Sequence, residues 1–125
     1  MKIDYATPIF NSYPQYRMGM GMDWNIENPF DYSTLHWNVE GVEKPSQTEL
    51  VEKFVEIYYD KEINEYKSKR GGEYLSFAEQ FDQIYHKGVD AWKISIQEIK
   101  DKYPKTLFDS AELARRKAES LDFII

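Results

Sequence analysis

Residues 45–59, Pro-Ser-Gln-Thr-Glu-Leu-Val-Glu-Lys-Phe-Val-Glu-Ile-Tyr-Tyr, mark the point at which the sequence becomes helical. Ser46 and Glu49 form a capping box, in which the serine hydroxyl accepts a bond from a free amide and the glutamate reaches back. Behind it, one helical face carries apolar residues at steps of three and four: Leu50, Phe54, Ile57, Tyr58 and Tyr66. The pattern predicts a helix from about residue 47 to about residue 69 that stops at Gly71-Gly72.

Two shorter helices are predicted next along the chain. Ser76-Phe77-Ala78-Glu79 is a second capping box, and Gly88 should end this helix as a C-terminal cap. Asp90 is then expected to cap a third helix, which Pro104 stops because proline cannot continue a helix. The buried face of the first of these helices is expected to consist of Phe77, Phe81, Ile84 and Tyr85. Phe81 is predicted to share one core with Trp92, Ile96 and Ile99 of the second.

The sequence before Pro45 has a different character, since prolines and glycines interrupt it and no helical period lasts longer than a turn. Within it, residues 34–39 alternate between polar and apolar side chains, which is the period of a half-buried strand. Ile3 and Tyr5 are expected to begin a second short strand.

These patterns together predict an α+β fold, with a short irregular N-terminal β region packed on three to four helices. Residues 1–45 form an aromatic, partly extended N-terminal arm with the short strands. Residues 46–105 form a helical module, and residues 106–125 form a C-terminal helix that starts from Asp109 or Ser110.

The N-terminal arm is also the predicted binding segment. Residues 11–30 combine aromatic side chains with three methionines and show no period that would place them in a core. Disordered segments are usually poor in aromatic residues, and methionine side chains adapt to irregular surfaces. We therefore expect this segment to pack on another protein chain. The predicted partner-binding residues are Tyr13, Tyr16, Met18, Met20, Met22, Trp24 and Phe30, together with Tyr59 of the long helix.

Composition excludes several classes of function. The 125 residues include no cysteine, so a disulfide framework, a thiolate metal site and a thiol nucleophile are all excluded. With 16 basic and 22 acidic residues the net charge is −6, which disfavours direct binding of nucleic acid. No apolar stretch is long enough to span a membrane, and no signal peptide is recognisable. We expect a soluble protein, made and kept inside a cell, without a membrane partner.

His86 is the residue that an enzyme would use, because Asp82 lies four residues before it on the same helical face. No local motif supplies a nucleophile or a polarising group beside it. The structural interpretation is a histidine near a helix C-terminus, favoured there by the helix dipole and paired with Asp82. His36 and His86 lack the spacing of a metal site, and the glycines fit no phosphate or dinucleotide motif. We therefore expect no catalytic residue, metal or cofactor, with a small enzyme or ligand-binding protein centred on His86 as the alternative.

The stretch from Lys44 to Lys105 carries a recurrent pattern. Its motifs are Lys44-Pro45-Ser46, Glu49-Leu50, Arg70, Glu73-Tyr74, Gln80-Phe81-Asp82-Gln83-Ile84-Tyr85-His86, Gly88, Asp90-Ala91-Trp92, Ile96 and Lys100-Asp101-Lys102-Tyr103-Pro104-Lys105. In this pattern, over roughly half of its length, the chain resembles small proteins of tailed bacteriophages that are described as tail-fibre assembly chaperones or tail-associated proteins. It departs from them at Leu75, where relatives commonly have proline, in its longer N-terminal arm and in the helix after Lys105.

The resemblance implies a non-enzymatic, tail-associated accessory protein that acts by protein–protein contacts, either as a virion component or as an assembly factor. The implied partners are phage tail or tail-fibre proteins, with self-association as a further option. The implied location is the host cytoplasm during assembly, and the virion if the protein is one of its components. No catalytic residues come with the resemblance. A generic interaction module of the host is a further alternative.

Overall fold

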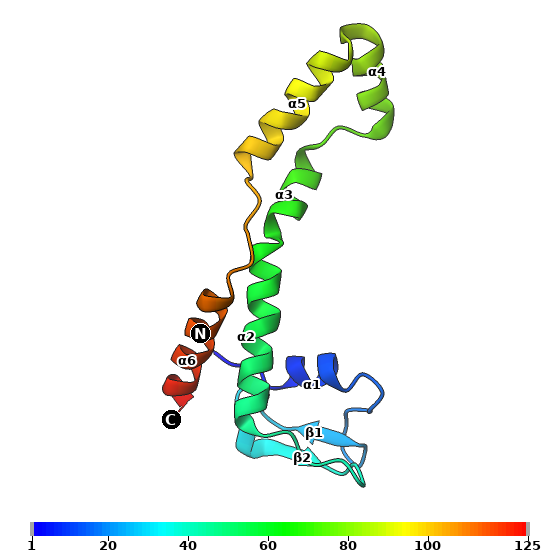
Figure 1. Ribbon diagram of the computed structural model, residues 1–125. Coiled ribbons are helices and arrows are strands. Elements are labelled where there is room, and N and C mark those ends of the chain that lie inside the picture. Colours follow the sequence, from blue (N-terminus) through cyan, green and yellow to red (C-terminus); the bar gives the residue numbers. More distant parts are fainter. Residues whose placement is uncertain (1, 125) are drawn as a thin grey trace. The chain divides into compact units, whose positions relative to one another are not determined.

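The computed structural model describes residues 2–124, which form an α+β fold (Figure 1). The helices are α1 (Ala6–Ser12), the 3-10 helix η1 (Tyr32–Thr34), α2 (Gln47–Ile63), α3 (Glu65–Glu73), α4 (Phe77–Lys87), α5 (Val89–Lys102) and α6 (Ser110–Ile124). The strands are β1 (Trp24–Ile26) and β2 (Leu35–Trp37), which pair antiparallel. A mostly helical chain with a short sheet near its N-terminus confirms the predicted fold class.

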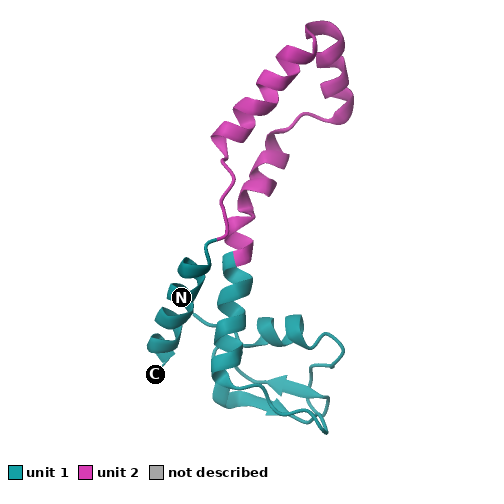
Figure 2. Ribbon diagram, viewed as in Figure 1, with its two compact units in different colours: residues 1–59, 109–125 teal, residues 60–108 magenta. Residues whose placement is uncertain are grey.

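The chain divides into two compact units (Figure 2). Unit 1 comprises residues 1–59 and 109–125, and unit 2 comprises residues 60–108. These boundaries differ from those of the three predicted segments, because the N-terminal region and α6 share unit 1 with most of α2. The two units are defined by contacts between residues that are distant in sequence, and such contacts cannot be predicted from local sequence patterns.

The predicted strand within residues 34–39 is present as β2. The predicted second strand at Ile3 and Tyr5 is wrong, because neither residue lies in a strand. The partner of β2 is β1, with Trp24 opposite Trp37 and Ile26 opposite Leu35. Ile3 and Tyr5 are buried instead in the segment that leads into α1. The carboxylate of Asp4 accepts a hydrogen bond from the amide of Ala6 at 2.9 Å, which satisfies a free donor of the first turn. Pro8 falls early in α1, where a missing amide breaks no bond of the helix.

Helix α2 starts as predicted and ends differently. The hydroxyl of Ser46 accepts a hydrogen bond from the amide of Glu49 at 3.1 Å, as the capping box requires. The helix is interrupted at Asn64, whose side-chain amide donates to the carbonyl oxygen of Asp60 at 2.8 Å and so competes with the backbone ladder. Gly71-Gly72 do not stop the helix, because α3 continues through them to Glu73. This corrects the predicted single helix over residues 47–69.

The core of unit 1 brings the N-terminal region, the sheet and α2 together. Its buried residues are Ile3, Tyr5, Ala6, Ile9, Trp24, Ile26, Leu35, Leu50, Val51 and Phe54. Leu121 and Ile124 of α6 pack against this cluster from the other end of the chain. Further along α2, Val55 and Tyr59 are also buried. Residues 1–45, which were predicted to form an arm, therefore supply seven of these ten buried residues.

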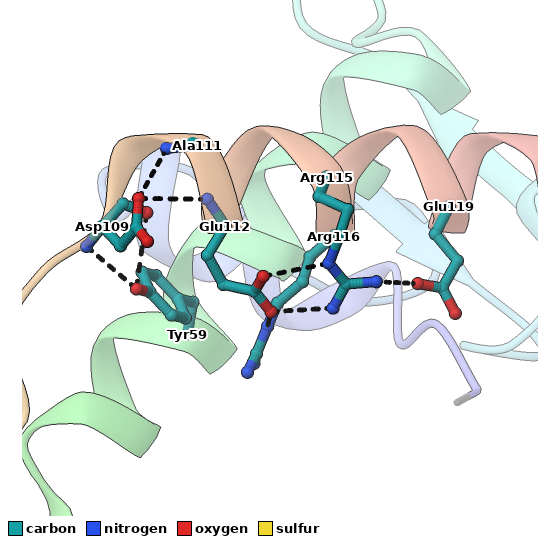
Figure 3. A network of polar contacts seen from close by, with 7 residues as sticks. All are labelled: Tyr59, Asp109, Ala111, Glu112, Arg115, Arg116 and Glu119. Carbon is teal, nitrogen blue, oxygen red and sulfur yellow. Dashed lines mark hydrogen bonds and ion pairs between the residues drawn. The ribbon is translucent and has the colours of Figure 1, made fainter.

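A polar network fixes the start of α6 beside α2 (Figure 3). The Asp109 carboxylate accepts bonds from the amides of Ala111 and Glu112, at 3.0 and 3.3 Å, and so caps α6 as predicted. The backbone amide of Asp109 donates to the hydroxyl of Tyr59 at 3.0 Å. The guanidinium of Arg116 lies 4.9 Å from the centre of the Tyr59 ring. Tyr59 therefore has its ring and its hydroxyl engaged within unit 1.

The same network lowers the pKa of Glu112. Its carboxylate accepts two bonds from Arg115, at 2.7 and 2.9 Å, and one from Arg116 at 2.9 Å. These bonds, with that of Arg115 the larger cause, lower the pKa of Glu112 from 4.5 to about 2. Because this pKa lies below the usual value, the stabilisation is complete above pH 4.5 and is lost as the pH falls towards 2.

We expect an NMR titration of the Glu112 side chain to show a midpoint near pH 2, and the Arg115→Gln variant to raise it towards 4.5. Glu119→Gln is the matched control, because it removes the other ionic partner of Arg115 and should leave the midpoint low. A midpoint near 4.5 in the unaltered chain would contradict this network.

Unit 2 is a helical hairpin of α4 and α5 with α3 beside α5. The predicted capping box at the start of α4 is confirmed, since the hydroxyl of Ser76 accepts a hydrogen bond from the amide of Glu79 at 3.2 Å. Gly88 ends α4 with a φ of +86°, a left-handed conformation that favours glycine. Helix α5 begins directly at Val89, so Asp90 lies in its first turn and is not its cap. This corrects the predicted role of Asp90. The helix ends at Lys102, two residues before Pro104.

Arg70 and Glu73 of α3 hold the C-terminal end of α5. Arg70 donates from Nε to the carbonyl oxygen of Tyr103 at 2.8 Å and from Nη2 to that of Lys100 at 3.3 Å. A cation here satisfies free carbonyl groups and complements the helix dipole. Glu73 accepts bonds from Lys102 Nζ at 2.6 Å and from the Tyr103 hydroxyl at 2.9 Å. The bond from Lys102 is the main reason why the pKa of Glu73 is lowered.

Candidate functional site

Residues 17–22, which we name the methionine loop, join the end of the N-terminal helical region to β1. The amide of Arg17 donates to the Asp23 carboxylate at 2.9 Å, and the amide of Gly19 donates to the carbonyl oxygen of Trp24 at 2.8 Å. At the other end, the side chain of Asn38 donates to the carbonyl oxygen of Met22 at 3.2 Å. The backbone of the loop is therefore tied to unit 1 at both ends.

The side chains of the loop point away from the core. Met20 is 90% exposed, and Met18 and Met22 are each more than two-fifths exposed. Gly19 and Gly21 make this possible with φ values of +149° and +75°, which residues with a Cβ rarely adopt. A Cβ on Gly19 would also lie 3.2 Å from Cγ of Met22. The loop thus presents three thioether side chains, which suit an adaptable apolar contact, on a bonded backbone.

Of the remaining predicted contact residues, Phe30 is exposed, whereas a second group packs within unit 1. Phe30 is about half exposed, with Nζ of Lys2 lying 5.0 Å from the centre of its ring. Tyr13 and Tyr16 stack on one another, with ring centres 5.8 Å apart, and both meet Trp37 edge-on. These three rings pack against the core of unit 1.

Trp24 and Tyr59 complete the second group, because both are buried inside unit 1. Phe10 packs edge-on against Trp24, with ring centres 5.1 Å apart. The prediction that Trp24 and Tyr59 contact a partner is therefore corrected, since both side chains are buried. Tyr13 and Tyr16 are partly buried, and a contact through their exposed parts stays a prediction. The sequence showed no common period for these residues because Trp24 belongs to β1 and Tyr59 to α2, while Tyr13 and Tyr16 follow α1. The exposed predicted residues are Met18, Met20, Met22 and Phe30.

The face of α4 that was expected to be buried is exposed. Phe77 is 81%, Phe81 69% and Tyr85 85% exposed. Helix α4 instead turns Gln80 and Gln83 towards α5, where Gln80 accepts from the indole of Trp92 at 3.0 Å and Gln83 donates to the hydroxyl of Ser95 at 2.7 Å. The sequence did contain an indication of this orientation. Gln80 and Gln83 are three residues apart, so both lie on one face of the helix and can bond to a neighbouring element.

The predicted core of unit 2 is therefore corrected. Trp92, Ile96 and Ile99 do share one face of α5, but each is only partly buried, and Phe81 is exposed. Gln80 takes the place on α4 that Phe81 was expected to occupy opposite Trp92. Ile96→Ala should accordingly cost less than the several kcal/mol typical of a fully buried isoleucine.

His86 is exposed, and its ring packs edge-on against Tyr85 with ring centres 4.9 Å apart. Within residues 2–124 it forms no ion pair with Asp82, so the predicted pair is not made. His36 lies 3.7 Å from the carboxylate of Glu27 on the surface of unit 1. Among the described residues, no group of three histidine, aspartate or glutamate side chains is placed to hold a metal ion. No helix in the same part of the chain is long and apolar enough to cross a membrane.

Several residues of the motifs between Lys44 and Lys105 have structural roles in unit 2. Arg70 and Glu73 bind the end of α5, and Gln80 binds Trp92 across the hairpin. Gly88 provides the left-handed turn between α4 and α5. These residues define how the hairpin is built, and the exposed side chains beside them remain available for contacts.

Comparisons with known proteins found no matching family model, no matching curated protein and no matching solved structure.

Proposed function

We propose that this chain is a non-enzymatic, tail-associated accessory protein of a tailed bacteriophage, acting through protein–protein contacts. The observation that carries the contact function is the methionine loop, where Met20 is 90% exposed although the backbone around it is hydrogen-bonded. Exposed methionines on an ordered loop contribute apolar contact area, and ordering the loop in advance lowers the entropy lost on binding. The phage assignment is supported by the motifs between Lys44 and Lys105.

The partner that fits this surface is a tail or tail-fibre protein with an apolar patch. Three flexible thioethers adapt to patches of different shape, which suits a protein that covers an assembling partner. The acidic surroundings in unit 1, with seven basic and thirteen acidic residues, disfavour a nucleic-acid partner at the same surface. The protein would act in the host cytoplasm during assembly.

Co-expression with each tail and tail-fibre protein of the same genome tests this function. We expect one of them to co-purify with the unaltered chain and with Met20→Leu, which keeps an apolar side chain of similar size. Met20→Asp should weaken that binding by at least about tenfold, because a charge would be buried in the contact. The free energy of unfolding should stay within about 0.5 kcal/mol, because the side chain is on the surface. Co-purification of no tail protein, or equal binding by Met20→Asp, would refute the proposal.

Mass spectrometry of purified particles separates the two forms of the proposal. A virion component should be present at a fixed ratio to the other tail proteins, whereas an assembly chaperone should be present in infected cells and absent from particles.

A further inference from the structure

The methionine loop, which lies between α1 and β1 (Figure 1), presents three thioether side chains to the solvent. Met20 is 90%, Met22 49% and Met18 41% exposed. None of the three belongs to the buried cluster of unit 1, and the fourth methionine, Met1, lies outside the described residues. A small dissolved reagent therefore reaches the loop without any opening of the fold.

The reagent that thioethers meet in a cell is a peroxide, which oxidises them to sulfoxides. The sulfur lone pair attacks one oxygen of hydrogen peroxide, so that the O–O bond breaks as an S–O bond forms. The proton on the transferred oxygen moves to the departing oxygen, which leaves as water. Sulfur loses two electrons and the peroxide gains them. The chain has no cysteine, so no thiol of its own competes for the peroxide.

The bonds that order the loop do not involve its sulfurs. The amide of Met22 donates to the carbonyl oxygen of Gly19 at 3.0 Å, and that of Gly19 donates to the carbonyl oxygen of Trp24 at 2.8 Å. The side chain of Asn38 donates to the carbonyl oxygen of Met22 at 3.2 Å. These bonds use main-chain atoms of the loop, which oxidation of a thioether leaves unchanged. Oxidation should therefore alter the surface of the loop and leave unit 1 folded.

Oxidation reverses the character of that surface. A methionine side chain is flexible and apolar, whereas its sulfoxide is polar and accepts hydrogen bonds from water. Burying a polar group that has no hydrogen-bond partner costs free energy, so a sulfoxide opposes an apolar contact. A methionine sulfoxide reductase, with a dithiol as the electron donor, removes the oxygen as water and restores the thioether.

We propose that Met18, Met20 and Met22 form a reversible oxidation site, at which a peroxide converts the surface of the methionine loop from apolar to polar. The consequence for binding rests on the proposed function: the reduced loop binds the tail protein, and the oxidised loop does not.

Treatment of the full chain with hydrogen peroxide tests the site without any partner. Peptide mapping by mass spectrometry should show one added oxygen on Met20 at least about twofold faster than on Met18 or Met22, because reactivity follows exposure. The oxidised chain should elute earlier from a hydrophobic interaction column, and treatment with the reductase and dithiothreitol should restore its elution. Its thermal unfolding midpoint should be unchanged.

The matched control replaces Met18, Met20 and Met22 by leucine, which is apolar and has no sulfur. Its elution should not respond to peroxide, although Met1 is still present. Equal oxidation rates at the three positions, unchanged elution of the oxidised chain, or loss of cooperative unfolding on oxidation would each overturn the proposal.

Binding to the co-purifying tail protein gives the second readout. Oxidation should weaken the binding of the unaltered chain by at least about tenfold, and the leucine variant should bind equally before and after peroxide. If a tail protein binds the reduced and oxidised chains equally, the oxidation proposal fails and the proposed function stands. If no tail protein binds the reduced chain, the proposed function fails, whereas the oxidation rates and the elution still decide whether the site exists.

Discussion

Deleting residues 1–30 should unfold unit 1 rather than remove a dispensable arm. The segment contributes Ile3, Tyr5, Ile9, Trp24 and Ile26 to the buried cluster. Burying one large apolar side chain stabilises a fold by about 1.5–3 kcal/mol, so the five together contribute on the order of 10 kcal/mol. That is comparable with the whole stability of a typical domain, about 5–15 kcal/mol. The deletion should therefore abolish cooperative thermal unfolding of unit 1, as followed by circular dichroism and by the dispersion of its NMR signals.

The control for this deletion is substitution of exposed residues in the same segment. Changing Met18, Met20 and Met22 to serine should leave the unfolding transition near that of the unaltered chain, because all three are exposed. If the deletion variant still unfolds cooperatively with its helix content unchanged, the N-terminal residues are not part of the core.

Trp24→Ala is expected to be the most damaging single substitution considered for unit 1. Trp24 is 0% exposed, pairs with Trp37 across the sheet and packs edge-on against Phe10. Removing a fully buried tryptophan side chain costs about 3–5 kcal/mol, because apolar contact is lost and a cavity remains. Urea unfolding followed by far-ultraviolet circular dichroism should show this loss as a lower midpoint.

Trp24→Phe is the informative companion. The indole Nε1 of Trp24 is buried without a hydrogen-bond partner in the described structure. Leaving a buried donor unpaired costs about 1–3 kcal/mol, so removing it offsets part of the volume lost in the phenylalanine variant. We expect a net cost below about 2 kcal/mol. Equal destabilisation by alanine and phenylalanine would show that the indole group is needed for more than filling space.

The starts of α2, α4 and α6 and the ends of α4 and α5 could be predicted from the sequence, because their causes are local. Ser46 and Ser76 bond to amides three residues ahead, Asp109 caps α6 in the same way, and Gly88 adopts a left-handed conformation. The alternation over residues 34–39 likewise marks β2, since the two faces of a strand differ within a few residues.

The partners of these elements were decided only by the tertiary structure. The strand that pairs with β2 is Trp24–Ile26, which lies in a stretch without a readable period. The sequence predicts that the face of α4 with Phe77, Phe81 and Tyr85 is buried, because a helical pattern shows which residues lie together and not which neighbour they meet. In the structure, Gln80 accepts a hydrogen bond from Trp92 of α5 and Gln83 donates one to Ser95, so this side of α4 faces α5 while Phe77, Phe81 and Tyr85 are exposed.

Among the candidate contact residues, too, some positions followed from the sequence and others were decided by the tertiary structure. The methionines at positions 18, 20 and 22 are exposed, as a polarisable apolar loop with two glycines led us to expect. Tyr13 and Tyr16, in the same stretch, stack beside Trp37 instead. The sequence alone determined where α2, α4 and α6 begin and which of their residues share a face, because those depend on bonds within a few residues. Whether a face meets the core, another helix or solvent depends on packing between residues far apart in the chain, and only the tertiary structure decided it.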